Sequence, residues 1–256
     1  MTEIVPNSPD PWSPLRALTP ARIGLARAGA SLATQPLLDF RLAHARARDA
    51  VHAPLDQARL VTDIATLGIP VLAVASAATD RRCYLLRPDL GGRLAPDAAA
   101  TLAPHVAAYD VAFVIADGLS ARAAQMHATP LLAAVLALLR RDQAGWHIAP
   151  LVIARHGRVA IGDAVAAALG AACVTILIGE RPGLTAPDSM GAYLTWRPGP
   201  HTTDADRNCI SNIRPEGIGY TDAGRKLAQM LHTMRARRLS GVRLKDETDG
   251  RLIEQG

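Results

Sequence analysis

Three short apolar runs in the second half of the chain alternate with segments of helical pattern. The runs lie at residues 111–116, 151–154 and 173–178. The helical segments that follow the first two runs end near Arg140 and at Gly170. Apolar runs that alternate with helices form β-α-β units, whose parallel strands are buried on both faces of the sheet. The pattern therefore predicts an α/β fold with a mostly parallel sheet over residues 106–256.

The N-terminal part of the chain predicts mainly helices. One helix is expected from Thr34, which can cap it, to the helix breaker Pro54, with Pro36 in its first turn. A second helix is expected over residues 55–67, where Gly68 ends it.

Two further apolar runs, at residues 69–76 and 83–87, are short enough to be strands. Residues 1–18 contain four prolines, which predicts an irregular tail. We therefore expect three parts: this tail, a mainly helical N-terminal region at residues 19–105, and an α/β domain at residues 106–256.

Polar and turn-forming residues follow each expected strand of the second half. Asp117 and Gly118 come after the first strand, residues 155–159 after the second, and residues 179–183 (GERPG) after the third. Open α/β sheets bind their ligands outside the carboxyl ends of the strands. We therefore expect these three turns to line a site.

The composition narrows the class of protein. Hydrophobic residues make up 49% of the chain and aromatic residues only 4%, so Ala, Leu, Val and Ile must build the core. The formal net charge is +5, and arginine supplies 26 of the 28 basic residues. The arginines are dispersed and no aromatic residues interleave with them, which favours a coding bias of a GC-rich genome over nucleic-acid binding. We expect no nucleic-acid partner.

The cysteines and the N-terminus favour a soluble protein of the cytoplasm. Cys83, Cys173 and Cys209 are isolated and form no CxxC pair. This argues against a disulfide framework and a zinc site, and for a reducing compartment. No apolar stretch has the length of a membrane span, and the acidic, proline-rich N-terminus differs from a secretory signal.

Common catalytic and nucleotide-binding motifs are incomplete in this chain. Residues 24–31 have the spacing of a P-loop, but Ala30 stands where a lysine should reach the phosphates. No G-x-G-x-x-G follows an expected strand, no H-E-x-x-H occurs, and Ser120 lacks the second glycine of a nucleophile elbow. Residues 206–213 (DRNCISNI) are dense in polar groups, and two interpretations are equally open: a loop tied down by its side chains, or the wall of a ligand site.

Four blocks of the sequence carry a resemblance to a known family. They lie at residues 18–52 (LTPARIGLARAGASLATQPLLDFRLAHARARDAVH), 116–121 (ADGLSA), 177–184 (LIGERPGL) and 206–213 (DRNCISNI). In this order and spacing they resemble the small subunit of ethanolamine ammonia-lyase. The resemblance runs from about Leu18 to Gly241 and leaves the N-terminal tail outside.

The resemblance implies a partner and a cofactor. In that family a large subunit, a (β/α)8 barrel, holds the substrate and most of the adenosylcobalamin site, and a Rossmann-like domain of the small subunit closes over the cofactor. The subunits form a large hetero-oligomer that converts ethanolamine to acetaldehyde and ammonia by a radical reaction. The family's cobalamin contacts fall here on Val159, Glu180 and Cys209, and the resemblance implies no catalytic residue and no metal ligand in this chain.

Each of these residues also has a structural interpretation. As a cofactor contact, Glu180 would accept hydrogen bonds from the corrin amides, Val159 would contact the nucleotide tail, and Cys209 would pack as a small polarizable group. Otherwise Glu180 would pair with an arginine such as Arg181, and Cys209 would be a buried core thiol. The D-x-H-x-x-G signature of cobalamin enzymes that replace the lower cobalt ligand with histidine is absent, so the nucleotide base is expected to stay on cobalt.

Two other functions stay open. One is an assembly or regulatory subunit, in which the helical N-terminal region binds the barrel subunit and the α/β domain only caps it. The other is a stand-alone nucleotide-binding oxidoreductase, which the missing glycine fingerprint disfavours. The expected location is the cytoplasm, and residues 1–18 leave open whether the protein enters a bacterial microcompartment.

Overall fold

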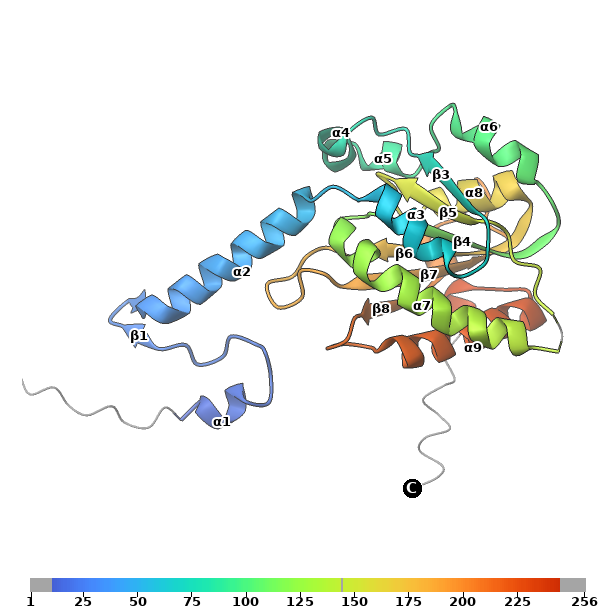
Figure 1. Cartoon of the computed structure of the whole chain (residues 1–256). Helices are drawn as coiled ribbons and strands as arrows, with labels where there is room; N and C mark the ends of the chain where they lie inside the picture. The colour runs from blue at the N-terminus through green and yellow to red at the C-terminus, as the bar shows by residue number, and fades with distance from the viewer. Residues whose placement is uncertain (1–10, 144, 245–256) are drawn as a thin grey trace, which may run out of the picture.

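A six-stranded sheet forms the centre of the molecule in a computed structural model that describes residues 11–143 and 145–244 (Figure 1). The strands are β3 (Val71–Ala75), β4 (Tyr109–Ala116), β5 (Leu151–Arg155), β6 (Ala171–Gly179), β7 (Met190–Trp196) and β8 (Arg207–Ile213). Their order is β3-β5-β4-β6-β7-β8. The first four in this order are parallel, and β7 and β8 add to them antiparallel. The fold is therefore α/β with a mixed, mostly parallel sheet, and β4, β5 and β6 are the three strands expected from the apolar runs.

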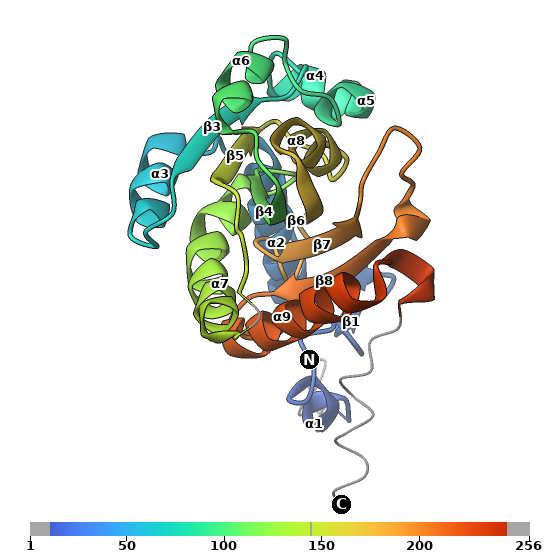
Figure 2. The same cartoon turned by 90° about the vertical axis from the view of Figure 1, so that its right-hand side faces the viewer.

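Helices cover both faces of the sheet (Figure 2). One face packs against α3 (Gln57–Ala65), α7 (Ala121–Arg141) and α9 (Tyr220–Arg237), and the other against α6 (Ala98–Leu102) and α8 (Ile161–Leu169). Alternate residues of β4 pack against the two helix layers, because successive side chains of a strand point to opposite faces. Phe113 faces α7 and Val114 faces α8. Burial on both faces explains why β4 reads as an unbroken apolar run.

One helix, α7, is long and apolar enough to cross a membrane by length and composition alone. Half of its most apolar window is buried inside the molecule. Its apolar side chains pack between the sheet and α9, so α7 is a core helix of the α/β layers.

The antiparallel edge of the sheet was not expected from the sequence. Residues 206–213 contain the whole of β8, and β7 pairs with it through a bulge between Met190 and Ala192. Ile210 and Ile213 of β8 face the core, whereas Cys209 and Ser211 are exposed. The prediction of a strand at residues 83–87 is wrong, because this run lies in α4 (Arg81–Leu86), where the Asp80 carboxylate caps the helix by accepting from the Cys83 amide at 2.8 Å.

The N-terminal segment extends away from the sheet (Figure 1). It contains α1 (Ser13–Arg16), the short pair β1 (Arg27–Ala28) and β2 (Ser31–Leu32), and the long helix α2 (Thr34–His52). Ala33 occupies the N-cap position of α2 without a side-chain bond, so the prediction of a Thr34 cap is wrong. Residues 1–10 of the expected tail lie outside the described residues.

The remaining short helices are α5 (Pro88–Gly91), η1 (Ala103–His105), η2 (Asp204–Asp206) and η3 (Gly241–Arg243). The run at residues 69–76 contains β3, which pairs with β5 along its whole length. The sheet thus takes one edge strand from the segment before residue 106, and the division of the chain at that residue stays a prediction.

Candidate functional site

A cleft of about 390 Å³ lies at the carboxyl edge of the sheet. Leu119 after β4, Val159 after β5 and Glu180 after β6 line it, and Tyr84 and Tyr193 form further parts of its wall. All three strand-end turns expected from the sequence contribute to this lining. The structure therefore brings Val159 and Glu180 into one cleft, although they lie 21 positions apart in the sequence.

The Glu180 carboxylate is held in place by hydroxyl and amide donors from β8 and from the residue before β7. It accepts hydrogen bonds from the hydroxyls of Ser189 and Ser211 and from the Asn212 amide, the last at 3.3 Å. Gly191 leaves the space that this side chain occupies, because a Cβ there would lie 2.9 Å from Glu180 Oε1. The pairing of Glu180 with an arginine is thus wrong for the described part of the chain, where its partners are these three donors.

Asp117 joins the ends of β4 and β5 beneath the cleft. Its Oδ1 atom accepts from the amides of Gly118 and Gly157, both at 3.1 Å. Its Oδ2 atom lies 3.8 Å from Arg81 Nη1. Burial raises the pKa of the Asp117 carboxyl, whereas a hydrogen bond from the backbone of His156 and the nearby Arg81 guanidinium act in the opposite direction.

Gly118 makes a backbone contact that requires glycine. Its φ is +56°, and a Cβ would lie 2.2 Å from the Gly179 carbonyl oxygen. The next amide, that of Leu119, donates to the same oxygen at 2.9 Å. The turn after β4 is therefore packed directly against the residue that precedes Glu180.

Tyr84 forms a wall of the cleft that the sequence did not reveal. Its ring is fully buried, and the guanidinium groups of Arg81 and Arg158 lie 4.7 Å and 4.3 Å from its centroid. Burial raises the pKa of Tyr84 to about 12. Its hydroxyl and the Nε atom of Arg158 are buried and have no hydrogen-bond partner in the described structure. Buried polar atoms of this kind are rare unless a ligand or water satisfies them.

Cys209 lies beside the cleft. It is opposite Tyr193 in the pairing of β7 with β8, and burial and the neighbouring thiol both raise the pKa of Tyr193. The residue is exposed, so the interpretation as a buried core thiol is wrong. Ser120 has a structural role, because its hydroxyl caps α7 at Ala123 and donates to the Pro187 carbonyl.

No group of three or more histidine, cysteine and acidic side chains that could hold a metal ion occurs among the described residues. The candidate site is therefore defined by the cleft and its polar walls.

Comparison with known proteins identifies the family. The model of the ethanolamine ammonia-lyase light chain matches residues 9–245. An ethanolamine ammonia-lyase small subunit of Azotobacter vinelandii is 51% identical, with 97% of this chain and 93% of the relative covered. Those of Xanthomonas campestris and Pseudomonas fluorescens are 52% and 48% identical, with 97% of this chain and more than nine-tenths of each relative covered. The chain belongs to the ethanolamine ammonia-lyase small-subunit family.

Membership in this family confirms the resemblance drawn from the four sequence blocks. Three of the blocks, at residues 116–121, 177–184 and 206–213, meet at or beside the cleft. The fourth, at residues 18–52, includes α2 and lies outside the sheet (Figure 1). The family name describes a lyase, and the words "small subunit" in the names of the relatives imply a large subunit as partner.

Proposed function

We propose that this chain is the small subunit of an adenosylcobalamin-dependent ethanolamine ammonia-lyase and that its cleft holds part of the cofactor. One observation carries the proposal. Val159 and Glu180, two positions that the family resemblance assigns to cobalamin, line the same cleft at the carboxyl edge of the sheet. This is the edge where open α/β sheets bind ligands. In this proposal the α/β layers are a Rossmann-like domain that closes over a cofactor bound mainly by a barrel-shaped large subunit.

The donors and acceptors of the cleft suit a corrin with many amide arms. An ionised carboxylate offers about four acceptor sites, and Glu180 uses three of them for protein donors, so one remains for an amide N–H. The Tyr84 hydroxyl and Arg158 Nε lack partners within the described residues, but both atoms are buried, so they would bind an amide carbonyl or a phosphate of the cofactor only after the lining of the cleft moves. Val159 supplies apolar contact, and Cys209 packs with Tyr193.

The chemistry of the reaction belongs to the cofactor, which supplies a radical when its Co–C bond breaks. The residues of this chain hold and shield it. The carboxylate of Glu180 is oriented before binding by its three donors, so little side-chain entropy is lost when it contacts the cofactor. We assign no catalytic residue to this chain, and the large subunit would bind ethanolamine.

A second candidate function rests on α2. Leu38, Phe40 and Leu42 expose 52%, 39% and 51% of their surface, and Ala50 is the buried residue of this helix. An isolated helix of this kind is marginally stable without a packing partner. This favours an assembly subunit that docks on the large subunit through α2, with the cleft of secondary importance.

Co-expression with the large subunit tests the proposal. We expect ammonia release from ethanolamine only when both subunits and adenosylcobalamin are present. Activity of the large subunit alone at the same rate would contradict the proposal. Under the assembly function, Leu38→Asp with Leu42→Asp would abolish co-purification, whereas changes in the cleft would leave cobalamin affinity unchanged.

The proposed setting is a large hetero-oligomer in the cytoplasm, inside or outside a bacterial microcompartment. Nucleic acid and membrane have no part in it. Fractionation of cells that express both subunits, followed by detection of this chain in the microcompartment fraction, distinguishes the two locations.

A further inference from the structure

We propose that Arg81 is a positioning residue that ties the end of α2 to the cofactor cleft, so that the position of this helix and the shape of the cleft depend on each other. The inference rests on the proposed function, because it takes the cleft as the cofactor site. Arg81 opens α4, and one guanidinium group reaches both structures.

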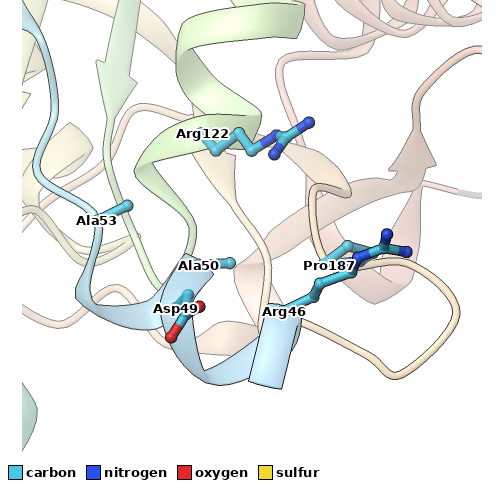
Figure 3. Close-up of a pocket in the computed structure, with 6 residues that line it drawn as sticks. All are labelled: Arg46, Asp49, Ala50, Ala53, Arg122 and Pro187. Carbon is cyan, nitrogen blue, oxygen red and sulfur yellow. The ribbon is translucent and has the colours of Figure 1, made fainter. Parts of the chain in front are cut away.

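The first contact of Arg81 is at the C-terminal end of α2. Its Nε atom donates to the Val51 carbonyl at 2.7 Å. The last carbonyls of a helix have no partner within the helix, and arginine is a favourable donor to them. Here α2 leaves the molecule beside a cavity of about 460 Å³, lined by Arg46 and Asp49 of the helix, by Arg122 of α7 and by Pro187 (Figure 3). The bond from Arg81 therefore ties the helix end to the α/β layers in addition to the packing of α2 against α7.

The second contact is at the cleft. Arg81 Nη1 donates to the Gly118 carbonyl at 2.7 Å and lies 3.8 Å from the Asp117 carboxylate. Gly118 contacts Gly179 so closely that no Cβ fits between them. The Leu119 amide also donates to the Gly179 carbonyl at 2.9 Å, so we expect a shift of Gly118 to move Gly179, and with it Glu180.

The guanidinium between these contacts is held firmly. Its carbon lies 4.7 Å from the centroid of the Tyr84 ring, and the Arg81 side chain is only 18% exposed. A planar guanidinium can donate to Val51 and Gly118 at once while stacking on the ring, whereas the single ammonium of lysine cannot reproduce this geometry. Lysine would still place a positive charge near Asp117. Arg81→Lys therefore removes the double hydrogen bond while it keeps the positive charge.

The bridge predicts a reciprocal effect. If α2 docks on the large subunit, the docked position of the helix fixes Arg81, and Arg81 in turn fixes Gly118 at the cleft. Coupling between two binding events is the same in both directions. Cofactor in the cleft should therefore stabilise the end of α2, which lies outside the cleft.

The test uses the assembled enzyme with Arg81→Lys, and with Arg82→Lys as the matched control on the exposed side of the same helix. A coupling between α2 and the cleft of ordinary size should weaken cobalamin binding about tenfold in Arg81→Lys, and Arg82→Lys should bind like the wild type. Hydrogen exchange should speed up in Arg81→Lys at both residues 51–53 and residues 118–120. Unchanged affinity, or faster exchange at only one of the two segments, would overturn the inference.

Two further measurements keep the outcomes distinct. If Arg81→Lys does not assemble, the wild-type enzyme decides: adding adenosylcobalamin should slow exchange at residues 51–53, and no change there would refute the coupling. Glu180→Ala is measured in parallel. Normal cobalamin affinity in Glu180→Ala would count against the proposed function itself, whereas weak binding in Glu180→Ala with normal binding in Arg81→Lys would remove only the role of Arg81.

Discussion

Gly191→Ala displaces the Glu180 carboxylate without changing Glu180 itself. The added Cβ would lie 2.9 Å from Glu180 Oε1 and 3.2 Å from Tyr193 Cε2. Ordinary contacts between carbon and oxygen begin at about 3.3 Å, so the carboxylate must retreat by about 0.4 Å. The Asn212 amide bonds the other carboxylate oxygen, Oε2, at 3.3 Å, so a movement of the carboxylate would strain a bond that is already long. Overpacking of this kind costs about 2 kcal/mol, which lowers the melting temperature of a chain of this size by about 4 to 8 °C.

Thermal and urea unfolding of a double-mutant cycle measure this effect. Gly191→Ala should cost about 2 kcal/mol with Glu180 present and much less in the Glu180→Ala background, because the clashing carboxylate is then gone. Gly199→Ala is the control, since an added Cβ there has no heavy atom within 4 Å. Equal costs of Gly191→Ala in both backgrounds would show that the carboxylate does not occupy the space above Gly191.

Three further predictions concern the rest of the molecule. Asp163→Asn should lower the free energy of unfolding in urea by about 3 kcal/mol. The Arg207 guanidinium, which is 5% exposed and lies 2.7 Å from Asp163, then loses its main partner. The control Glu216→Gln should change the free energy of unfolding by less than about 1 kcal/mol, because Glu216 is 73% exposed in its pair with Arg214. Burial lowers the pKa of His127, so below about pH 6.5 the unfolded chain binds more protons than the folded one. The free energy of unfolding should therefore fall as the pH drops through this range. An equally steep fall in a His127→Gln variant would argue against this assignment. Burial raises the pKa of the Cys173 thiol to about 12 and also raises that of Cys209. Of these two thiols only Cys209 is exposed, so iodoacetamide at about pH 8 should spare Cys173 and modify Cys209 in the native protein, which peptide mass spectrometry checks.

The centre of the sheet could be predicted from the sequence, and its edge could not. β4, β5 and β6 are buried on both faces, which produces unbroken apolar runs. β8 buries Ile210 and Ile213 on one face and exposes Cys209 and Ser211 on the other, so it reads as a polar segment until its pairing with β7 is known. The apolar run at residues 83–87 is short enough to be a strand, but Asp80, three residues before Cys83, is a helix-cap signal that favours the helix observed.

Part of the candidate site could also be predicted from the sequence, and part of it could not. The strand-end turns with Val159 and Glu180 followed from the rule for open α/β sheets, and their assignment to cobalamin followed from the family resemblance. Tyr84 and Arg81 were missed because their contacts are distant in sequence: Arg158 is 74 positions from Tyr84, and Gly118 is 37 positions from Arg81. Nor could the sequence show that Ser189 and Ser211 would fix the Glu180 carboxylate, since the second of these contacts depends on the antiparallel edge.

The central claim is that the cleft with Glu180 binds cobalamin. Its most direct test is the dissociation constant of adenosylcobalamin for the assembled enzyme, with Glu180→Ala compared against the exposed control Glu216→Ala. Loss of a hydrogen bond to a charged acceptor corresponds to about a tenfold change or more. We expect Glu180→Ala to bind at least about tenfold more weakly than the wild type and Glu216→Ala to bind equally well. Equal dissociation constants for Glu180→Ala and the wild type would contradict the claim.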